Sequence, residues 1–184
     1  VATVGEALAL RRIVPTARIV VLGPSHPDEH RAAREAGLEL VVTAEGRLPV
    51  GLPLHLKLDT GMGRWGVREL APPGGDVVGL MTHLACADSD PAFSRLQLER
   101  FLEATADHSD LVRHAANGAA AIGLPGARLD AARCGIALYG IDPFGEDAAH
   151  HGLRPALRWE SEVARVVELR AGESTGYGRR FVAT

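Results

Sequence analysis

The strongest constraint on the fold is a repeated alternation between short apolar runs and segments with helical patterning. Helix starts such as Asp90-Pro91 and stops such as Gly37 separate the two kinds of segment. Because strands that alternate with helices run parallel, the pattern predicts an α/β fold, either a barrel or a doubly wound layer. Strands are predicted over 17–23, 38–43, 52–59, 76–84, up to His114 and over 134–140, and helices over 4–12, 27–36 (capped by Ser25), 91–107 and from Asn117.

The patterning changes after Pro155. Residues 156–170 have no helix-starting signal, and their valines alternate with other residues in a way typical of β-strands. We therefore expect a β domain to begin here, with the boundary in the loop 143–155. The sequence predicts a parallel α/β domain over 1–145, followed over 146–184 by a linker and the start of that β domain.

Composition narrows the class of protein. The 184 residues are 46% apolar and 23% charged, which excludes a disordered chain. A net charge of −3 gives no indication of a nucleic-acid partner, and no apolar run approaches the ~20 residues that a membrane helix needs. The two cysteines, Cys86 and Cys134, are too few for a disulfide framework, so a reduced, cytoplasmic protein is expected.

The segment 59–66, DTGMGRWG, matches three patterns. It begins with the tripeptide of the aspartic proteases, but their chemistry needs two carboxylates that share a proton, and the chain has one such tripeptide. Its glycines have the G-x-G-x-x-G spacing of a dinucleotide-binding loop, which requires a helix to begin there. Residues 69–75, ELAPPGG, leave room for barely one helical turn. The sequence therefore argues against both of these interpretations.

The third pattern is longer. The run HLKLDTGMGRWGV at 55–67 resembles the alanine racemase family, which uses pyridoxal 5'-phosphate in a (β/α)₈ barrel followed by a C-terminal β domain. Four further blocks match the family in the same order: THLACAD at 82–88, HAANGAA at 114–120, RCGIALYG at 133–140 and GESTGYGRRF at 172–181. The ordered matches extend over about two-thirds of the chain.

This resemblance implies both fold and activity. It implies an α/β, partial (β/α)₈ TIM-like barrel, pyridoxal phosphate as cofactor and an amino acid as substrate. The implied reaction is the interconversion of L- and D-alanine, which supplies D-alanine for peptidoglycan, in a homodimer with a shared active site. It also implies a central fragment, because the family's cofactor lysine lies upstream of Val1 and some substrate residues lie beyond Thr184.

Three residues correspond to the family's catalytic group. Tyr177 matches the tyrosine base that takes the α-proton of L-alanine. Because free tyrosine has a pKa of ~10, the base needs a neighbour that stabilises its anion, and His83 matches that neighbour. Arg133 matches the arginine that contacts this histidine and faces the pyridine nitrogen. An arginine keeps its own proton, so the nitrogen stays unprotonated and side reactions are limited.

Two further residues correspond to the substrate side of the site. Arg64 matches the arginine near the substrate carboxylate and the cofactor's phenolic oxygen, two groups that a planar guanidinium suits. Lys57, the only lysine of the chain, matches a lysine that the family carries as an N-carbamate. The carbamate is an anion that orients the arginine. The alternative for Lys57 is an ordinary buried lysine held in an ion pair.

The remaining matches concern the cofactor. The resemblance implies cofactor contacts from His83, Asn117, Gly118, Arg133, Gly135 and Ile136. Gly118 stands where the family has a phosphate-binding serine, so one hydroxyl contact is lost and weaker cofactor binding is expected. His114 is expected to support Arg133 from behind.

The chain also departs from the family. The segments between Thr43 and Leu52 and between Val67 and Val77 are too short for the barrel helices that the family has there. These departures keep two alternatives open. One is a racemase for serine or for a broader set of amino acids, and the other is a non-catalytic relic of the barrel.

Overall fold

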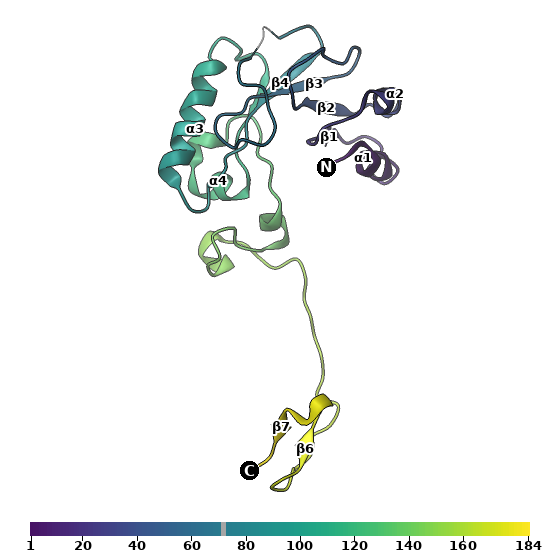
Figure 1. Cartoon of the computed structure of the whole chain (residues 1–184), viewed down its shortest axis with the longest axis vertical. Coiled ribbons are helices and arrows are strands. Elements are labelled where there is room, and N and C mark those ends of the chain that lie inside the picture. The colour runs from purple at the N-terminus through teal and green to yellow at the C-terminus, as the bar shows by residue number, and fades with distance from the viewer. Residues whose placement is uncertain (71–72) are drawn as a thin grey trace.

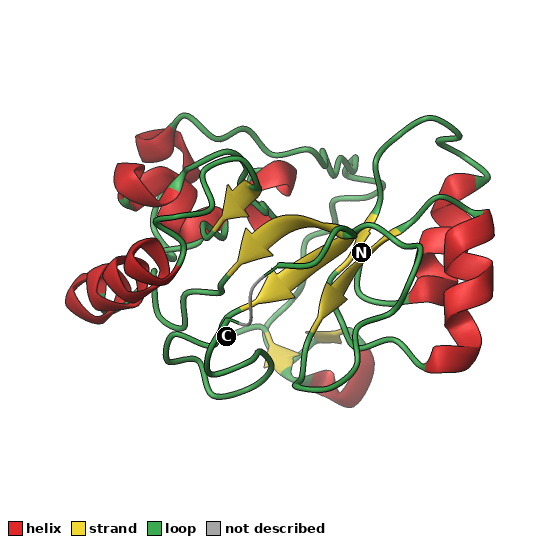
Figure 2. Cartoon of the chain, turned by 90° about the horizontal axis from the view of Figure 1, so that it is seen from above, coloured by secondary structure: helices red, strands yellow, loops and turns green. Residues whose placement is uncertain are grey.

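Five parallel strands form the sheet on which the rest of the chain is arranged. The computed structural model describes residues 1–70 and 73–184. The strands are Val20–Val21 (β1), Glu39–Val42 (β2), Leu54–Lys57 (β3), Val77–Met81 (β4) and Val112–His114 (β5), and they lie in this order across the sheet. Figures 1 and 2 show a curled sheet with helices along its outside. The predicted α/β, partial (β/α)₈ barrel is confirmed.

The helices follow the predicted positions closely. The α-helices are Val4–Arg11 (α1), His30–Glu35 (α2), Pro91–Ala104 (α3) and Gly118–Gly123 (α4). Asp90 and Asn117 cap α3 and α4, accepting hydrogen bonds from the backbone N–H groups of Phe93 and Ala120. The expected cap at Ser25 is wrong by one residue. His26 is the cap, because its own N–H donates to the Glu29 carboxylate at 2.7 Å while its ring accepts from the N–H of Asp28.

Short 3₁₀ helices complete the elements: Pro27–Glu29 (η1), Pro125–Ala127 (η2), Ile136–Tyr139 (η3), Ala148–His151 (η4) and Tyr177–Arg179 (η5). The connection from β2 to β3 contains no helix, and neither does the described part of the connection from β3 to β4. This agrees with the predicted loss of two outer helices. Two residues of the second connection, 71 and 72, lie outside the described residues.

The two faces of β3 have different surroundings. Leu54 and Leu56 belong to the apolar core, together with Phe101 of α3. His55 and Lys57 alternate with these leucines and are only 2% and 4% exposed, so the inner face of the sheet is buried as well. The polar groups on this inner face therefore have to find partners within the protein.

The predicted strand over 134–140 is wrong. Residues Ile136–Tyr139 form η3, closed by Gly140 at a φ of 75°. Asn117 and Arg133 make one isolated parallel bridge, after which local bonds such as Leu138 N–H to the Gly135 carbonyl replace a ladder. A strand needs a neighbour along its length, and β5 ends at His114.

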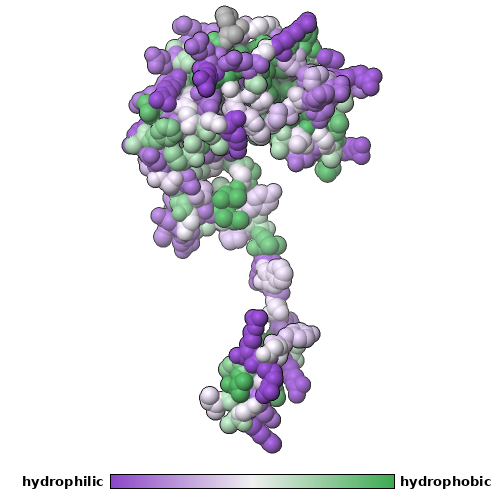
Figure 3. All heavy atoms as spheres, viewed as in Figure 1, coloured by the Kyte–Doolittle hydropathy of each residue, from purple (hydrophilic) through white to green (hydrophobic). Residues whose placement is uncertain are grey.

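The segment 156–170, where the β domain is expected to begin, contributes no strand of its own. Val163 and Val166 are 80% and 88% exposed, and the segment contains no helix or strand. Its valines have no second layer to pack against. The β structure lies further along, where Ser174–Thr175 (β6) and Phe181–Val182 (β7) form a two-stranded antiparallel sheet. Figure 3 shows this C-terminal part as a narrow extension from the larger body.

Candidate functional site

A cavity of about 420 Å³ lies beyond the carboxyl ends of β4 and β5. In α/β barrels this end of the sheet is the one that carries active sites. All six residues predicted to contact a cofactor line the cavity: His83, Asn117, Gly118, Arg133, Gly135 and Ile136. The structure thus brings this part of the predicted set together, and the roles of the individual residues remain predictions.

Arg133, one of the residues that line this cavity, is held by several hydrogen bonds. Its Nη1 donates to Nδ1 of His114 at 2.8 Å and to the His114 carbonyl at 3.0 Å. Its Nη2 donates to the carbonyls of Thr82 and Ala115 at 2.7 and 3.0 Å. Burial lowers the pKa of Arg133 to about 10, so the guanidinium remains a cation at neutral pH. The Nη protons are shared among these acceptors and Nδ1 of His83, and Nε–H is the donor without an acceptor among the described residues.

His83 lies beside this arginine. Its Nδ1 is 3.4 Å from Nη2 of Arg133. Burial, followed by the charge of Arg133, lowers the pKa of His83 to about 4. The imidazole is therefore neutral at pH 7. Because arginine has no acceptor, Nδ1 must accept in this contact, which leaves the proton of His83 on Nε2.

Asn117 organises the loop that carries Gly118. Its Oδ1 accepts from the N–H of Ala120 at 3.0 Å, and its Nδ2 donates to the Leu84 carbonyl at 3.2 Å. Its side chain is thus committed to local structure. A Cβ placed on Gly118 would lie 3.6 Å from that of Ala137, an ordinary van der Waals contact, so the fold itself does not require glycine at this position.

Lys57 and Arg64 meet at the indole ring of Trp65. Nζ of Lys57 lies 5.6 Å from the ring centroid, and Cζ of Arg64 lies 4.8 Å from it. Burial, then the charges of Arg64 and Arg133, lowers the pKa of Lys57. Within residues 1–70 and 73–184, no salt bridge involves Lys57. The described structure therefore gives no support to the ion-pair alternative for this lysine.

The DTG segment supports neither of its two other interpretations. The Asp59 carboxylate accepts hydrogen bonds from the backbone N–H groups of Gly61, Met62 and Gly63, so it stabilises its own loop. The described residues that follow form no helix before α3. The amides that a dinucleotide would need are therefore not presented by a helix.

Tyr177 is not brought to the cavity within one chain. It begins η5 on the C-terminal extension, and its side chain is fully exposed. Figure 1 shows the strands β6 and β7 separated from the barrel by a long extended segment. Within one chain, Tyr177 is therefore separated from the other predicted site residues.

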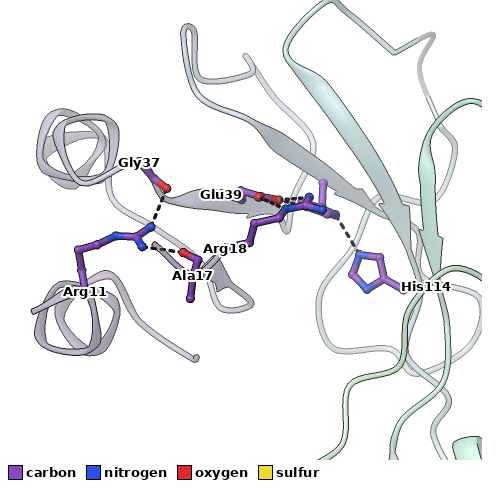
Figure 4. A network of polar contacts seen from close by, with 7 residues as sticks. Arg11, Ala17, Arg18, Gly37, Glu39 and His114 are labelled. Carbon is purple, nitrogen blue, oxygen red and sulfur yellow. Dashed lines mark hydrogen bonds and ion pairs between the residues drawn. The ribbon is translucent and has the colours of Figure 1, made fainter. Parts of the chain in front are cut away.

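Sequence reasoning named His114 but missed the polar residues that extend from it along the inner face of the sheet. Figure 4 shows Arg18, Glu39 and His114 in a connected line of polar contacts, which also includes His55. The available signal was a glutamate inside the apolar run LELVVT and a histidine in the alternating run LPLHLKLD. Both positions predict a buried polar group that needs a partner.

The fold and the cavity define a partial parallel α/β barrel with a cavity at the carboxyl ends of its strands. The sequence model of the family described as "Alanine racemase, N-terminal domain" matches residues 1–143. The chain belongs to the alanine racemase family. Within the described residues, no helix is long and apolar enough to cross a membrane.

Individual relatives agree with this assignment. The chain is 36% identical over 220 residues to the alanine racemase of Desulfosudis oleivorans, covering 98% of this chain and 56% of that protein. It is 43% identical over 150 residues to the alanine racemase of Laribacter hongkongensis, covering 76% of this chain and 41% of that protein. The crystal structure of the biosynthetic alanine racemase from Pseudomonas aeruginosa matches with a TM-score of 0.78 and 32% identity, covering 99% of this chain and 56% of that one. The chain thus spans about half the length of these relatives.

Proposed function

We propose that this chain provides the cofactor-facing part of an enzyme that interconverts L- and D-alanine. The observation that carries the proposal is the pairing of Arg133 with His83 in a cavity that also collects Asn117, Gly118 and the Gly135–Ile136 backbone. The family's named members support alanine as substrate. In a bacterium the product D-alanine would serve peptidoglycan synthesis.

The donors present at this site fit pyridoxal phosphate. The free Nε–H of Arg133 suits a pyridine nitrogen that is to accept a hydrogen bond and stay unprotonated. The turn around Gly118 and the Gly135–Ile136 backbone supply amides for a phosphate group. When bound, the cofactor supplies an electron-withdrawing ring that acidifies the α-carbon of an amino acid.

The residues of this chain would then provide one of the two bases. His83, with its proton on Nε2, can donate to the oxygen of Tyr177 and stabilise the phenolate that removes the α-proton. Arg133 keeps His83 in this state, because it can only donate to Nδ1. Since Tyr177 is fully exposed on the extension, we propose that a partner copy supplies it in a homodimer with a shared site.

Lys57 is proposed to carry an N-carbamate. A buried lysine with a lowered pKa is more readily neutral, and a neutral amine is the form that reacts with carbon dioxide. The carbamate would place an anion beside Arg64, where two cations now share the Trp65 ring. Intact-mass measurement should detect the added carboxylate. Lys57→Ala should lower activity, with partial rescue by chloride or a small carboxylate, whereas unchanged activity would contradict this role.

The organisation of the chain follows from the same proposal. Residues 1–145 would form the cofactor-binding part of the barrel, and 146–184 a linker with the beginning of the β domain. We also propose a cytoplasmic location, in keeping with the free thiols of Cys86 and Cys134. The shortened connections around β3 and the glycine at 118 favour one competing hypothesis, a barrel relic that binds no cofactor.

A cofactor titration tests the proposal. The full product of the gene is titrated with pyridoxal phosphate and followed by absorbance and equilibrium dialysis, and alanine racemisation is then measured on a chiral column. Arg133→Met should abolish specific binding, while Arg158→Met, on the exposed extension, should leave it unchanged. Saturable binding with racemisation supports the proposal. The absence of specific binding would favour the relic, and racemisation of serine at a comparable rate would favour the broader substrate range.

A further inference from the structure

A continuous line of hydrogen bonds joins the surface at Arg18 to Arg133 in the candidate site. Nε and Nη2 of Arg18 donate to the Glu39 carboxylate at 2.6 and 2.8 Å. Oε2 of Glu39 lies 2.8 Å from Nε2 of His55, and Nδ1 of His55 lies 2.9 Å from Nε2 of His114. Nδ1 of His114 then receives Nη1 of Arg133 at 2.8 Å. The line therefore crosses the inner face of the sheet from the β1 side to beyond β5.

The two ends of this line determine the position of every proton in it. Arg133 can only donate, so Nδ1 of His114 accepts and the proton of His114 lies on Nε2. That proton is donated to Nδ1 of His55, so the proton of His55 lies on Nε2 as well. It is donated in turn to Glu39, which as a carboxylate can only accept. A single arrangement thus satisfies all the contacts.

The neighbouring strand leaves room for this arrangement. Gly79 of β4 is in register with His55, and a Cβ at that glycine would lie 2.6 Å from Cε1 of His55 and closer still to Nδ1. The ring of His55 therefore passes over a glycine to reach His114, which is paired with Met81 on the next strand. A larger residue at 79 would close this path.

Burial makes the arrangement sensitive to the loss of any partner. His55 and His114 are 2% and 4% exposed. Burial lowers the pKa of His55, and burial with the charge of Arg133 lowers the pKa of His114 to about 3, so both rings are neutral at pH 7. The hydrogen bond from Arg18 lowers the pKa of Glu39, which keeps this carboxylate ionised. No salt bridge of the described residues joins Arg133 to a carboxylate directly.

We propose that Glu39 and His55 are positioning residues for Arg133, acting through His114. By terminating the line with an acceptor, Glu39 keeps His114 in the tautomer that receives Arg133, and so keeps Nη1 occupied and Nε directed to the cofactor side. Arg18 serves only to hold the carboxylate, at the surface. The functional meaning of this relay rests on the proposed cofactor role of Arg133. The relay itself is tested without cofactor.

The first test uses the wild-type chain. Nitrogen NMR of ¹⁵N-histidine-labelled protein distinguishes the two neutral tautomers, and coupling between nitrogens across an N–H···N hydrogen bond reports the His55–His114 contact directly. We expect His55 and His114 both to be protonated on Nε2 at pH 7, with measurable coupling between them. A proton on Nδ1 of either ring, or a charged ring, would overturn the relay.

Variants of Glu39 then test its role as the terminal acceptor. Glu39→Met keeps the length but removes the acceptor, so Nε2–H of His55 is left unpaired and the His55–His114 coupling should be lost. His114 can then take its other tautomer, which does not accept from Nη1 of Arg133, so exchange of the guanidinium protons should speed up roughly tenfold or more. Glu39→Gln keeps an oxygen for His55 while the largely exposed Arg18 turns to solvent, so the coupling should return.

Two controls complete the experiment. Arg18→Met should leave the coupling intact, and so should Glu99→Met on the exposed side of α3. Intact coupling in Glu39→Met would overturn the role of Glu39, and so would equal damage by Glu39→Gln. Because these signals need no pyridoxal phosphate, their failure is distinguishable from a failure of cofactor binding, which the titration reports separately.

Discussion

The barrel region and the C-terminal extension of this chain both contain valine- and leucine-rich segments. These segments form buried strands in the barrel region and remain exposed in the extension. In β3, Leu54 and Leu56 are buried on one face, and His55 is buried on the other. In the extension, the valine-rich segment 156–170 contains no strand, and its Val163 and Val166 are largely exposed. The difference shows that an apolar pattern becomes a strand only where a neighbouring strand and a covering layer are present.

The predicted site residues are likewise distributed over both regions. Arg133, His83 and His114 are already connected by hydrogen bonds in the barrel region. Tyr177 lies on the extension with its side chain fully exposed. We therefore expect variants in the barrel region to alter stability and cofactor binding, and variants in the extension to alter catalysis in the assembled enzyme with little effect on this chain's own folding.

The largest expected effect is that of Tyr177→Phe on catalysis. This substitution removes only the hydroxyl, so racemisation by the full gene product should fall by ~10²–10⁴-fold, the range typical of a lost general base. In deuterated water, α-proton exchange from L-alanine should fall far more than exchange from D-alanine, because one face of the substrate has lost its base. Circular dichroism should show unchanged folding.

Tyr139→Phe provides the matched control, because Tyr139 is an exposed tyrosine of η3 in the barrel region. Its activity should remain within a factor of two or so of the wild type, as for most surface changes. If Tyr177→Phe lowers exchange equally from both enantiomers, the tyrosine positions the substrate and is not a base. Full activity would remove it from the site.

The next largest effect is on the free energy of unfolding, and it should differ between two phenylalanines. Phe101 of α3 is fully buried, whereas Phe181 of β7 is 58% exposed. Phe101→Ala should lower the free energy of unfolding by about 3–5 kcal/mol, and Phe181→Ala should change it by less than about 0.5 kcal/mol in this chain. Urea unfolding followed by far-UV circular dichroism measures both. A similar loss for the two variants would mean that the extension packs onto the barrel in solution.

Much of the barrel region could be predicted from sequence because its signals are local. Capping residues such as Asp90 and Asn117 fix helix starts through contacts three residues away. The predicted strand over 134–140 failed because strand formation depends on a distant partner, which ends at His114. The local sequence carries the apolar pattern but not the position of the neighbouring strand.

The candidate site shows the same division. The residues around Arg133 were predictable because ordered motifs carry them. The line of hydrogen bonds through Glu39 and His55 could not be predicted, because its residues lie on strands that are far apart in sequence. It also depends on the strand register that places His55 beside Gly79. Two isolated polar residues in apolar runs predict that partners exist, but not which partners.

The glycine at this register position gives the third prediction. In Gly79→Ala the new Cβ would collide with the His55 ring, so the free energy of unfolding should fall by about 1–3 kcal/mol, as for other overpacked cores. Gly118→Ala meets only an ordinary contact and should be tolerated. Urea unfolding of the pair measures the difference. If Gly79→Ala is as stable as Gly118→Ala, the path of His55 over β4 is not tightly packed.

The smallest effect we predict is a change in cofactor affinity, which should follow a substitution in the cavity but not one elsewhere in the barrel region. Gly118→Ser restores the hydroxyl that the family has at this position, and the contact distance of 3.6 Å leaves room for it. One additional hydrogen bond to a phosphate should tighten pyridoxal phosphate binding by roughly 2- to 10-fold in the full gene product, since a net hydrogen bond contributes about 0.5–1.5 kcal/mol. Gly74→Ser, at an open position outside the cavity, is the control and should bind as the wild type does.

Equilibrium dialysis measures the affinities, with free phosphate as competitor. If Gly118→Ser binds no more tightly than Gly74→Ser, the cofactor phosphate does not lie at the start of α4, and the Gly135–Ile136 backbone becomes the remaining candidate within this cavity.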